Sequence, residues 1–101
     1  MKNYVAVLVK DPNDIGYSVH FPEVSGCFTC GDDMEDACGM ATEALALMLE
    51  YQGENDDILE PQGIQWVASH IDWDLDTEET SYTLVRIPYI KGFIYNRKIN
   101  K

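Results

Sequence analysis

Residues 21–49, FPEVSGCFTCGDDMEDACGMATEALALML, predict the end of a strand, a turn, a second short strand and a helix, one directly after the other. The first strand, over 17–21, alternates apolar and polar residues and ends at Pro22, because proline has no amide hydrogen to continue a strand ladder. Residues 23–26 predict a turn, and residues 27–30 predict the second strand. The rest of the chain is organised around this unit.

A helix is expected from residue 34 onward. Its apolar residues recur at intervals of three and four, which places them on one helix face. They are Met34, Ala37, Cys38, Ala41, Ala44, Leu45, Met48 and Leu49. Two pairs of carboxylates have the spacing that caps the amide groups of a first helical turn. These pairs are Asp33 with Asp36 and Asp32 with Glu35. Gly53 is placed to end the helix.

The remaining segments predict a sheet under this helix. Residues 4–9 are apolar on both alternating sets, so we expect a central strand that is covered on both faces. Residues 10–16 predict a turn. Residues 63–71 fit a short strand, but we favour a short helix or an irregular segment. Residues 81–87 predict the last strand. The expected fold is α+β, in the order ββ-β-α-β, with one main helix packed on a mostly antiparallel sheet of about four strands.

The order of these motifs resembles the amino-terminal domain of HicB antitoxins, over about residues 4–90. The motifs that carry the resemblance are Phe21-Pro22-Glu23, Ser25-Gly26-Cys27 and Thr29-Cys30-Gly31-Asp32, ahead of an Ala- and Leu-rich helix. Further support comes from Tyr4-Val5-Ala6-Val7, Asp11-Pro12, Gly16-Tyr17 and Glu43-Ala44-Leu45. The resemblance implies a partial ribonuclease H-like fold. It also implies an antitoxin of a type II toxin-antitoxin system that binds and neutralises a small basic RNA-cleaving toxin of the HicA kind.

The charge of the chain is lopsided. In all, 18 acidic and 7 basic residues give a net charge of −11. Residues 1–90, which we call the body, hold all 18 acids and three of the basic residues, a net charge of −15. Affinity for nucleic acid rests on neutralising phosphates, so the body should repel DNA and attract a basic protein. The alternative is that the acids only keep a small protein soluble.

At 101 residues the chain is expected to bury a single core, which we assign to residues 1–90. No apolar run is long enough to span a membrane, and no signal-peptide pattern follows Met1, so a cytoplasmic protein is expected. Residues 91–101 form a basic tail. In HicB proteins a DNA-binding module usually follows the domain, so the tail is either the start of such a module or a frayed end. Its candidate DNA contacts are Arg97, Lys98 and Lys101.

The cysteines predict neither a disulfide framework nor a metal site. Cys27, Cys30 and Cys38 are an odd number in a chain without an export signal. Cys27 and Cys30 are three residues apart on the expected strand, which sends them to opposite faces. No second pair of ligands completes a zinc site. We therefore expect reduced thiols and no metal or other cofactor.

Catalysis is not expected either. A ribonuclease H relative could hold Mg²⁺ with carboxylates, but the candidate acids lie in turns with turn-forming or capping roles. These acids are Asp11, Asp14, Asp32 and Asp33. His20 and His70 are not visibly paired with a nucleophile. A metal-dependent ribonuclease is thus an alternative function, as is a stand-alone oligomeric scaffold without a toxin.

The expected toxin-binding residues are acidic and aromatic, because carboxylates on rigid elements can meet Lys and Arg while an aromatic ring seals the contact from water. They are Tyr17, Glu23, Asp32, Glu35 and Asp36. We also expect a homo-oligomer, a dimer or higher, since the 82–87 strand and the apolar residues Phe93, Ile94 and Tyr95 leave edge and surface to hide.

Overall fold

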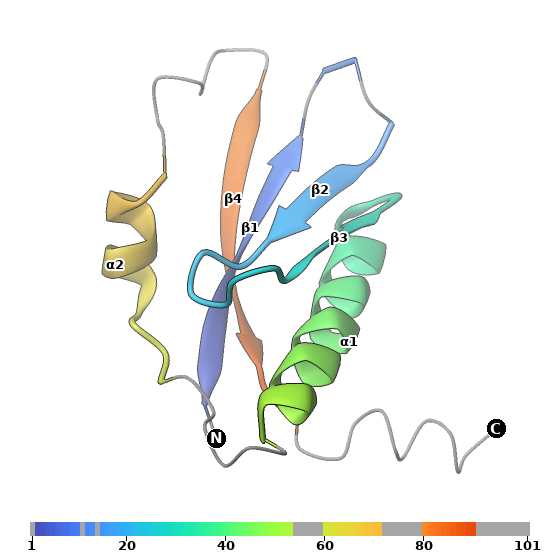
Figure 1. The fold of residues 1–101 in the computed structure, drawn as a ribbon. Helices are drawn as coiled ribbons and strands as arrows, with labels where there is room; N and C mark the ends of the chain where they lie inside the picture. The colour runs from blue at the N-terminus through green and yellow to red at the C-terminus, as the bar shows by residue number, and fades with distance from the viewer. Residues whose placement is uncertain (1, 11, 14, 54–59, 72–79, 91–101) are drawn as a thin grey trace, which may run out of the picture.

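The computed structural model describes residues 2–10, 12–13, 15–53, 60–71 and 80–90. Its elements are β1 (Asn3–Lys10), β2 (Tyr17–His20), β3 (Phe28–Gly31), α1 (Met34–Gly53), α2 (Ile64–Ser69) and β4 (Ser81–Pro88). The four strands form one sheet in the order β3-β2-β1-β4, and every neighbouring pair is antiparallel. Figure 1 shows α1 and α2 on either side of this sheet. The expected α+β fold with one main helix is confirmed.

The central strand β1 is covered on both faces, as its sequence predicted. Tyr4, Ala6 and Leu8 are fully buried in the cluster beneath α1. Val5 and Val7 alternate with them and pack against Val67 of α2 in a second cluster. Since side chains alternate between the faces of a strand, a run that is apolar at every position buries both faces.

The helix α1 begins where its cap places it. The Asp33 Oδ1 atom accepts a hydrogen bond from the Asp36 amide at 2.7 Å, and Asp36 Oδ2 accepts one from the Asp32 amide at 2.8 Å. Of the two capping pairs, Asp33 with Asp36 is therefore the one that forms. The expected apolar face packs on the sheet, except that Met34, at the first helical position, stays 37% exposed.

Glycines let β2, β3 and the start of α1 approach closely. A methyl group on Gly31 would overlap the backbone of Ala37, and one on Gly16 would overlap the carbonyl oxygen of Gly31. No side chain fits at either position without moving the backbone. The backbone at the start of α1 thus lies directly against the backbone of Gly31 at the end of β3.

The ambiguous segment 63–71 contains a short helix, α2, which confirms the favoured interpretation. It packs on the face of the sheet opposite α1 through Val67, with Ile64, Trp66 and Ile71 partly buried around it. The Trp66 ring stacks on His70 with centroids 3.9 Å apart. In the described part of the chain, neither helix has the length and apolar character needed to cross a membrane.

Candidate functional site

The segment between β2 and β3 folds into two consecutive β-turns. The Val24 amide donates to the Phe21 carbonyl at 3.0 Å, and the Cys27 amide donates to the Val24 carbonyl at 3.2 Å. The Phe21 amide closes the pair of turns on the Cys27 carbonyl at 3.0 Å. Gly26 has a φ of 79°, which the third position of a type II turn requires. These turns hold Glu23 toward the sheet.

Glu23 is buried and holds three backbone amides. Only 8% of it is exposed. Its Oε1 accepts a hydrogen bond from the Val5 amide at 2.7 Å, while Oε2 accepts from the Gln62 amide and from the Gly63 amide at 3.1 Å. Because β2 ends at His20 while β1 continues to Asn3, the Val5 amide lies beyond the last β2 partner, and the carboxylate takes that place.

This placement differs from the expectation that Glu23 projects from the surface toward a partner. Its carboxylate joins the sheet to the start of α2, since both oxygens are bonded to backbone groups of these two regions. No local sequence pattern indicates this role, because the amides come from segments far from Glu23 along the chain. A second link between the same regions is the ion pair of Lys2 with Glu60, 2.5 Å long and more exposed.

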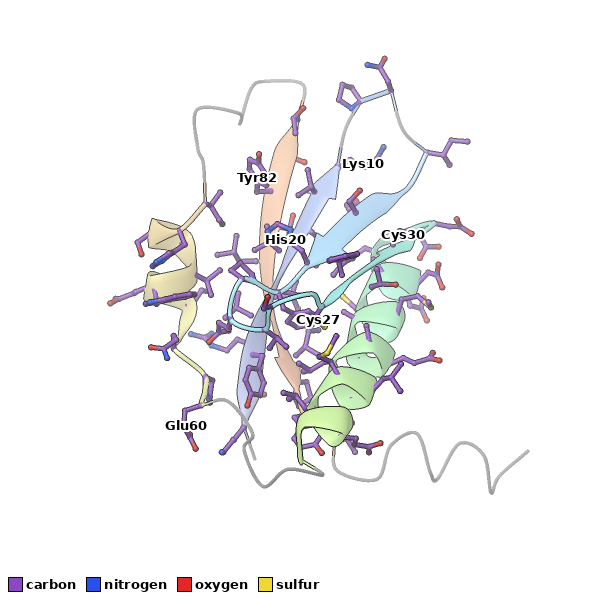
Figure 2. All side chains as sticks on the ribbon, viewed as in Figure 1. Lys10, His20, Cys27, Cys30, Glu60 and Tyr82 are labelled. Atoms are coloured by element: carbon purple, nitrogen blue, oxygen red, sulfur yellow. The ribbon has the colours of Figure 1, made fainter. Side chains whose placement is uncertain are left out.

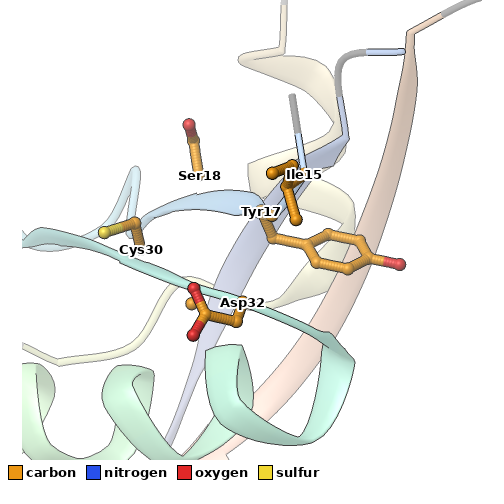
Figure 3. A pocket seen from close by; sticks show the side chains of 7 residues that line it. Ile15, Tyr17, Ser18, Cys30 and Asp32 are labelled. Atoms are coloured by element: carbon orange, nitrogen blue, oxygen red, sulfur yellow. The ribbon is translucent and has the colours of Figure 1, made fainter. Parts of the chain in front are cut away.

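Two of the predicted binding residues, Tyr17 and Asp32, line one pocket. We call it the strand-end pocket, because it lies where β2 begins and β3 ends (Figure 3). It has a volume of about 300 Å³ and is open to solvent. Its lining residues are Ile15, Gly16, Tyr17, Ser18, Cys30, Gly31 and Asp32. Tyr17 also packs against the core under α1, so its ring is anchored there.

The other predicted acids lie directly beside this pocket, at the start of α1. Asp32, Asp33, Glu35 and Asp36 are all exposed. Asp33 and Asp36 each use one carboxylate oxygen in the cap. Carboxylates in a first helical turn also interact favourably with the helix dipole. The four together form what we call the acidic turn, an anionic surface beside the strand-end pocket.

The three thiols differ in their exposure to solvent. Cys27 is buried, Cys30 is exposed and Cys38 is half-buried, and none is in a disulfide. Burial raises the pKa of the Cys27 thiol to about 11, so at neutral pH it is protonated. Cys27 precedes β3 and Cys30 lies on it (Figure 2). Cys27 belongs to the cluster under α1, whereas Cys30 pairs with Ser18 on the opposite face of the sheet.

The histidines take different places. Desolvation lowers the pKa of His20, so its ring is neutral at pH 7. His70 does have a serine neighbour, contrary to expectation: its Nδ1 lies 3.1 Å from Ser69 Oγ and 2.8 Å from the Trp66 carbonyl oxygen. The Ser69 hydroxyl itself lies 2.6 Å from that same carbonyl, to which it donates. These contacts complete the exposed end of α2 and do not activate the hydroxyl.

Several predicted sites lie outside the described residues. These are the candidate metal ligands Asp11 and Asp14 and the candidate DNA contacts Arg97, Lys98 and Lys101. Among the residues that are described, no group of three or more His, Cys, Asp or Glu side chains could hold a metal ion.

Two exposed apolar side chains near the pocket were missed by the sequence reasoning. Ile15 is 92% exposed and Phe28 is 72% exposed. A signal for Phe28 was present, because it alternates with Cys27 and Thr29 on its strand and therefore faces away from α1. Ile15 stands in the turn before β2, where an apolar residue serves no turn geometry.

The chain is similar to a known protein family and to a phage protein. A family model described as the HicB-like antitoxin of a bacterial toxin-antitoxin system matches residues 4–96. An uncharacterized 14.9 kDa protein of the rep-hol intergenic region of Haemophilus phage HP1 is 38% identical over 53 residues. That alignment covers 52% of this chain and 39% of the phage protein, so the chain spans about two fifths of this relative's length.

Proposed function

This chain belongs to the HicB-like antitoxin family of bacterial toxin-antitoxin systems, and on that premise we propose that it binds and neutralises a small basic RNA-cleaving toxin of the HicA kind. The observation that carries the proposal is the acidic turn beside the strand-end pocket. A toxin that grips RNA must present Lys and Arg around its cleaving residue. Carboxylates held on a rigid helix start can pair with those cations and cover the site without any catalysis by the antitoxin.

The binding residues that we propose are Tyr17, Asp32, Glu35 and Asp36. Tyr17 and Asp32 share the pocket wall, and Glu35 and Asp36 stand on the helical turn that follows. Glu23 contributes differently, because its carboxylate is occupied by three backbone amides. Its replacement would disturb the fold before it disturbed a contact with the toxin.

The first test is co-purification with the product of a neighbouring gene that encodes a short basic protein with a catalytic histidine. The second is the rate of association with that protein. Glu35→Lys should slow association by roughly threefold to tenfold at low salt and weaken its salt dependence, because exposed rim charges act mainly on the encounter rate. This single reversal is preferable to one that includes Asp36, whose carboxylate also accepts the Asp32 amide.

The matched control is Glu60→Lys, which makes the same change of charge at an exposed site beside α2. It removes only a surface ion pair, which contributes little to stability. The proposal expects wild-type association for this variant. If Glu60→Lys slows association and Glu35→Lys does not, the toxin binds near residues 54–60, which carry four acids in the sequence ENDDILE. The acidic turn is then not its site.

A second copy of the chain is the other partner that we propose. The strand β4 forms one edge of the sheet, and edges of this kind are commonly paired or shielded. Light scattering at tens of micromolar should give the mass of a dimer or higher oligomer. A monomer mass would remove this part of the proposal. The apolar residues Phe93, Ile94 and Tyr95, also predicted to be hidden by self-association, lie outside the described residues.

DNA binding by residues 1–90 is not part of the proposal. A body with a charge of −15 opposes phosphate, and the four basic residues of the tail can release only a few counterions. In a gel shift at physiological salt, the chain should bind operator DNA weakly unless a carboxy-terminal module is present. Tight, sequence-dependent binding by residues 1–101 would contradict this.

A further inference from the structure

Among the described residues, those opposite α1 cover only half the width of the sheet. The β1 and β4 half packs against α2 around Val67. On the β2 and β3 half, the strand register pairs His20 with Phe28 and Ser18 with Cys30. These four side chains share one face and all four are exposed, Phe28 to 72%. No described residue covers them, so an uncharged surface centred on an aromatic ring is left open.

The edge next to this surface is also open. In an antiparallel ladder, hydrogen-bonded and non-hydrogen-bonded pairs alternate. The Phe21 amide donates to the Cys27 carbonyl, so Phe21 and Cys27 are a hydrogen-bonded pair. Every second residue of β3 after Cys27, that is Thr29 and Gly31, therefore directs its backbone groups toward β2. The amides and carbonyls of Phe28 and Cys30 then point away from the sheet, where the described part of the chain provides no strand.

The sequence of β3, FTCG, lacks the features that close other edges. Natural edge strands are usually shielded by lysine, proline or a bulge. The edge strand β3 is short but carries neither a charge nor a proline.

Charge selects the partner for this edge. Directly after Gly31 the chain enters the acidic turn, and Asp32 lies at the rim of the strand-end pocket together with Ile15, which is 92% exposed. An apolar centre with charged residues at its rim is the usual arrangement of a protein interface. Here the rim is anionic, so it favours a cationic partner. A second copy would bring another body of −15 to the same place.

We propose that the open edge of β3 receives an extended segment of the basic toxin, which adds a strand to the sheet, lays an apolar side chain on Phe28 and directs Lys or Arg toward the acidic turn. This rests on the function proposed above, and it specifies where and how the toxin binds. Main-chain hydrogen bonds from Phe28 and Cys30 supply the register, and the acidic turn supplies the selectivity for a cation.

A pair of variants tests the apolar centre. Phe28→Glu should weaken affinity for the neighbouring gene's basic protein by about tenfold or more, which is the loss expected when a central interface side chain is truncated. It does so although the added negative charge would attract a basic partner. The control is Leu47→Glu, the same kind of change at a side chain that is 60% exposed on α1, where the affinity should stay within about twofold. Melting temperatures of both variants identify any loss that comes from unfolding.

Hydrogen exchange tests the added strand. On binding, the amides of Phe28 and Cys30 should become protected, whereas those of Thr29 and Gly31 should already be protected in the unbound chain. If the basic protein binds with wild-type affinity to Phe28→Glu and leaves the Phe28 and Cys30 amides unprotected, the added strand is wrong and the antitoxin function stands. If it does not bind the wild-type chain at all, the function itself is wrong. Protection that appears without it and rises with chain concentration would assign the edge to a second copy and overturn the proposal.

Discussion

The two helices cover opposite faces of one sheet but are held there in different ways. Helix α1 has 20 residues, its own cap and a continuous apolar face. Helix α2 has six residues, no side-chain cap and one fully buried side chain, Val67. Isolated helices shorter than about 12 residues are marginal in water, so α2 depends on its surroundings. Its surroundings supply the Glu23 carboxylate, which binds the Gln62 and Gly63 amides.

The difference shows two ways to build a layer on a sheet. The α1 layer is part of the core, and its loss should unfold the domain. The α2 layer is attached by a buried carboxylate and a small cluster, so it should be able to open while the rest stays folded, because local stability follows the local number of buried apolar contacts. The following four predictions test this comparison.

The largest effect is expected under α1. Leu45 is fully buried in the α1 cluster, so Leu45→Ala should lower the free energy of unfolding by about 3 kcal/mol through lost burial and a residual cavity. In urea unfolding, the midpoint should be lower, and the transitions followed by different spectroscopic signals should coincide. The control is Leu47→Ala, which lies on the exposed side of α1 and should change the free energy by less than about 0.5 kcal/mol. Equal losses in both variants would contradict the assignment of faces.

A smaller and more local effect is expected at Glu23. Glu23→Gln keeps the shape but removes the charge and places amide hydrogens near backbone amides, so it should cost about 2 kcal/mol. Hydrogen exchange should show that the α2 amides of Val67 and His70 lose protection before those of α1. Glu35→Gln, an exposed carboxylate, is the matched control. If the α1 and α2 amides lose protection together, the two layers are one cooperative unit.

The cap of α1 comes next. Asp33→Ala should lower the free energy of unfolding by about 1 kcal/mol, because the Asp36 amide loses its acceptor. Asp32→Ala is the comparison, and it should cost less, since the carboxylate that bonds the Asp32 amide belongs to Asp36. Calorimetry of the wild type with and without EDTA should give the same melting temperature. A metal-dependent melting temperature would instead revive the ribonuclease alternative.

The smallest effect should be a gain. Gly39 lies within α1, and a methyl group added there would meet no atom within 4 Å. Gly39→Ala should therefore raise the free energy of unfolding by about 0.5–1 kcal/mol, because alanine loses less backbone entropy on entering a helix. The same change at Gly31 should destabilise, since its methyl group would overlap Ala37. A higher melting temperature for Gly39→Ala and a lower one for Gly31→Ala would confirm that the start of α1 is tightly packed and that its outer face is open.

Much of this fold can be predicted from local sequence patterns. The period of α1 and the alternation of β1 and β4 involve residues that are neighbours in the sequence. The acidic residues before Met34 mark a helix start, but the pattern leaves Asp32 and Asp33 as equal candidates for the cap. Only the hydrogen bond from the Asp36 amide to Asp33 distinguishes them.

The candidate site was readable in part for the same reason. Tyr17 and Asp32 belong to motifs near the turn and the helix start, and the fold brings them to one pocket. Phe28 was overlooked, because exposure depends on what covers a strand face. In the described part of the chain the cover on this face is α2, which packs on β1 and β4.

The α1 helix, the central strand and the family can be predicted from local patterns, because each depends on periodicity or on a short motif. The role of Glu23 follows from the three-dimensional fold, since its amide partners lie 18, 39 and 40 residues away along the chain. An acidic residue after a proline is a surface residue by every local rule. It is buried here because three backbone amides have no backbone acceptor in their own elements. One of them is the Val5 amide beyond the end of β2, and two stand at the start of α2. One carboxylate accepts hydrogen bonds from all three.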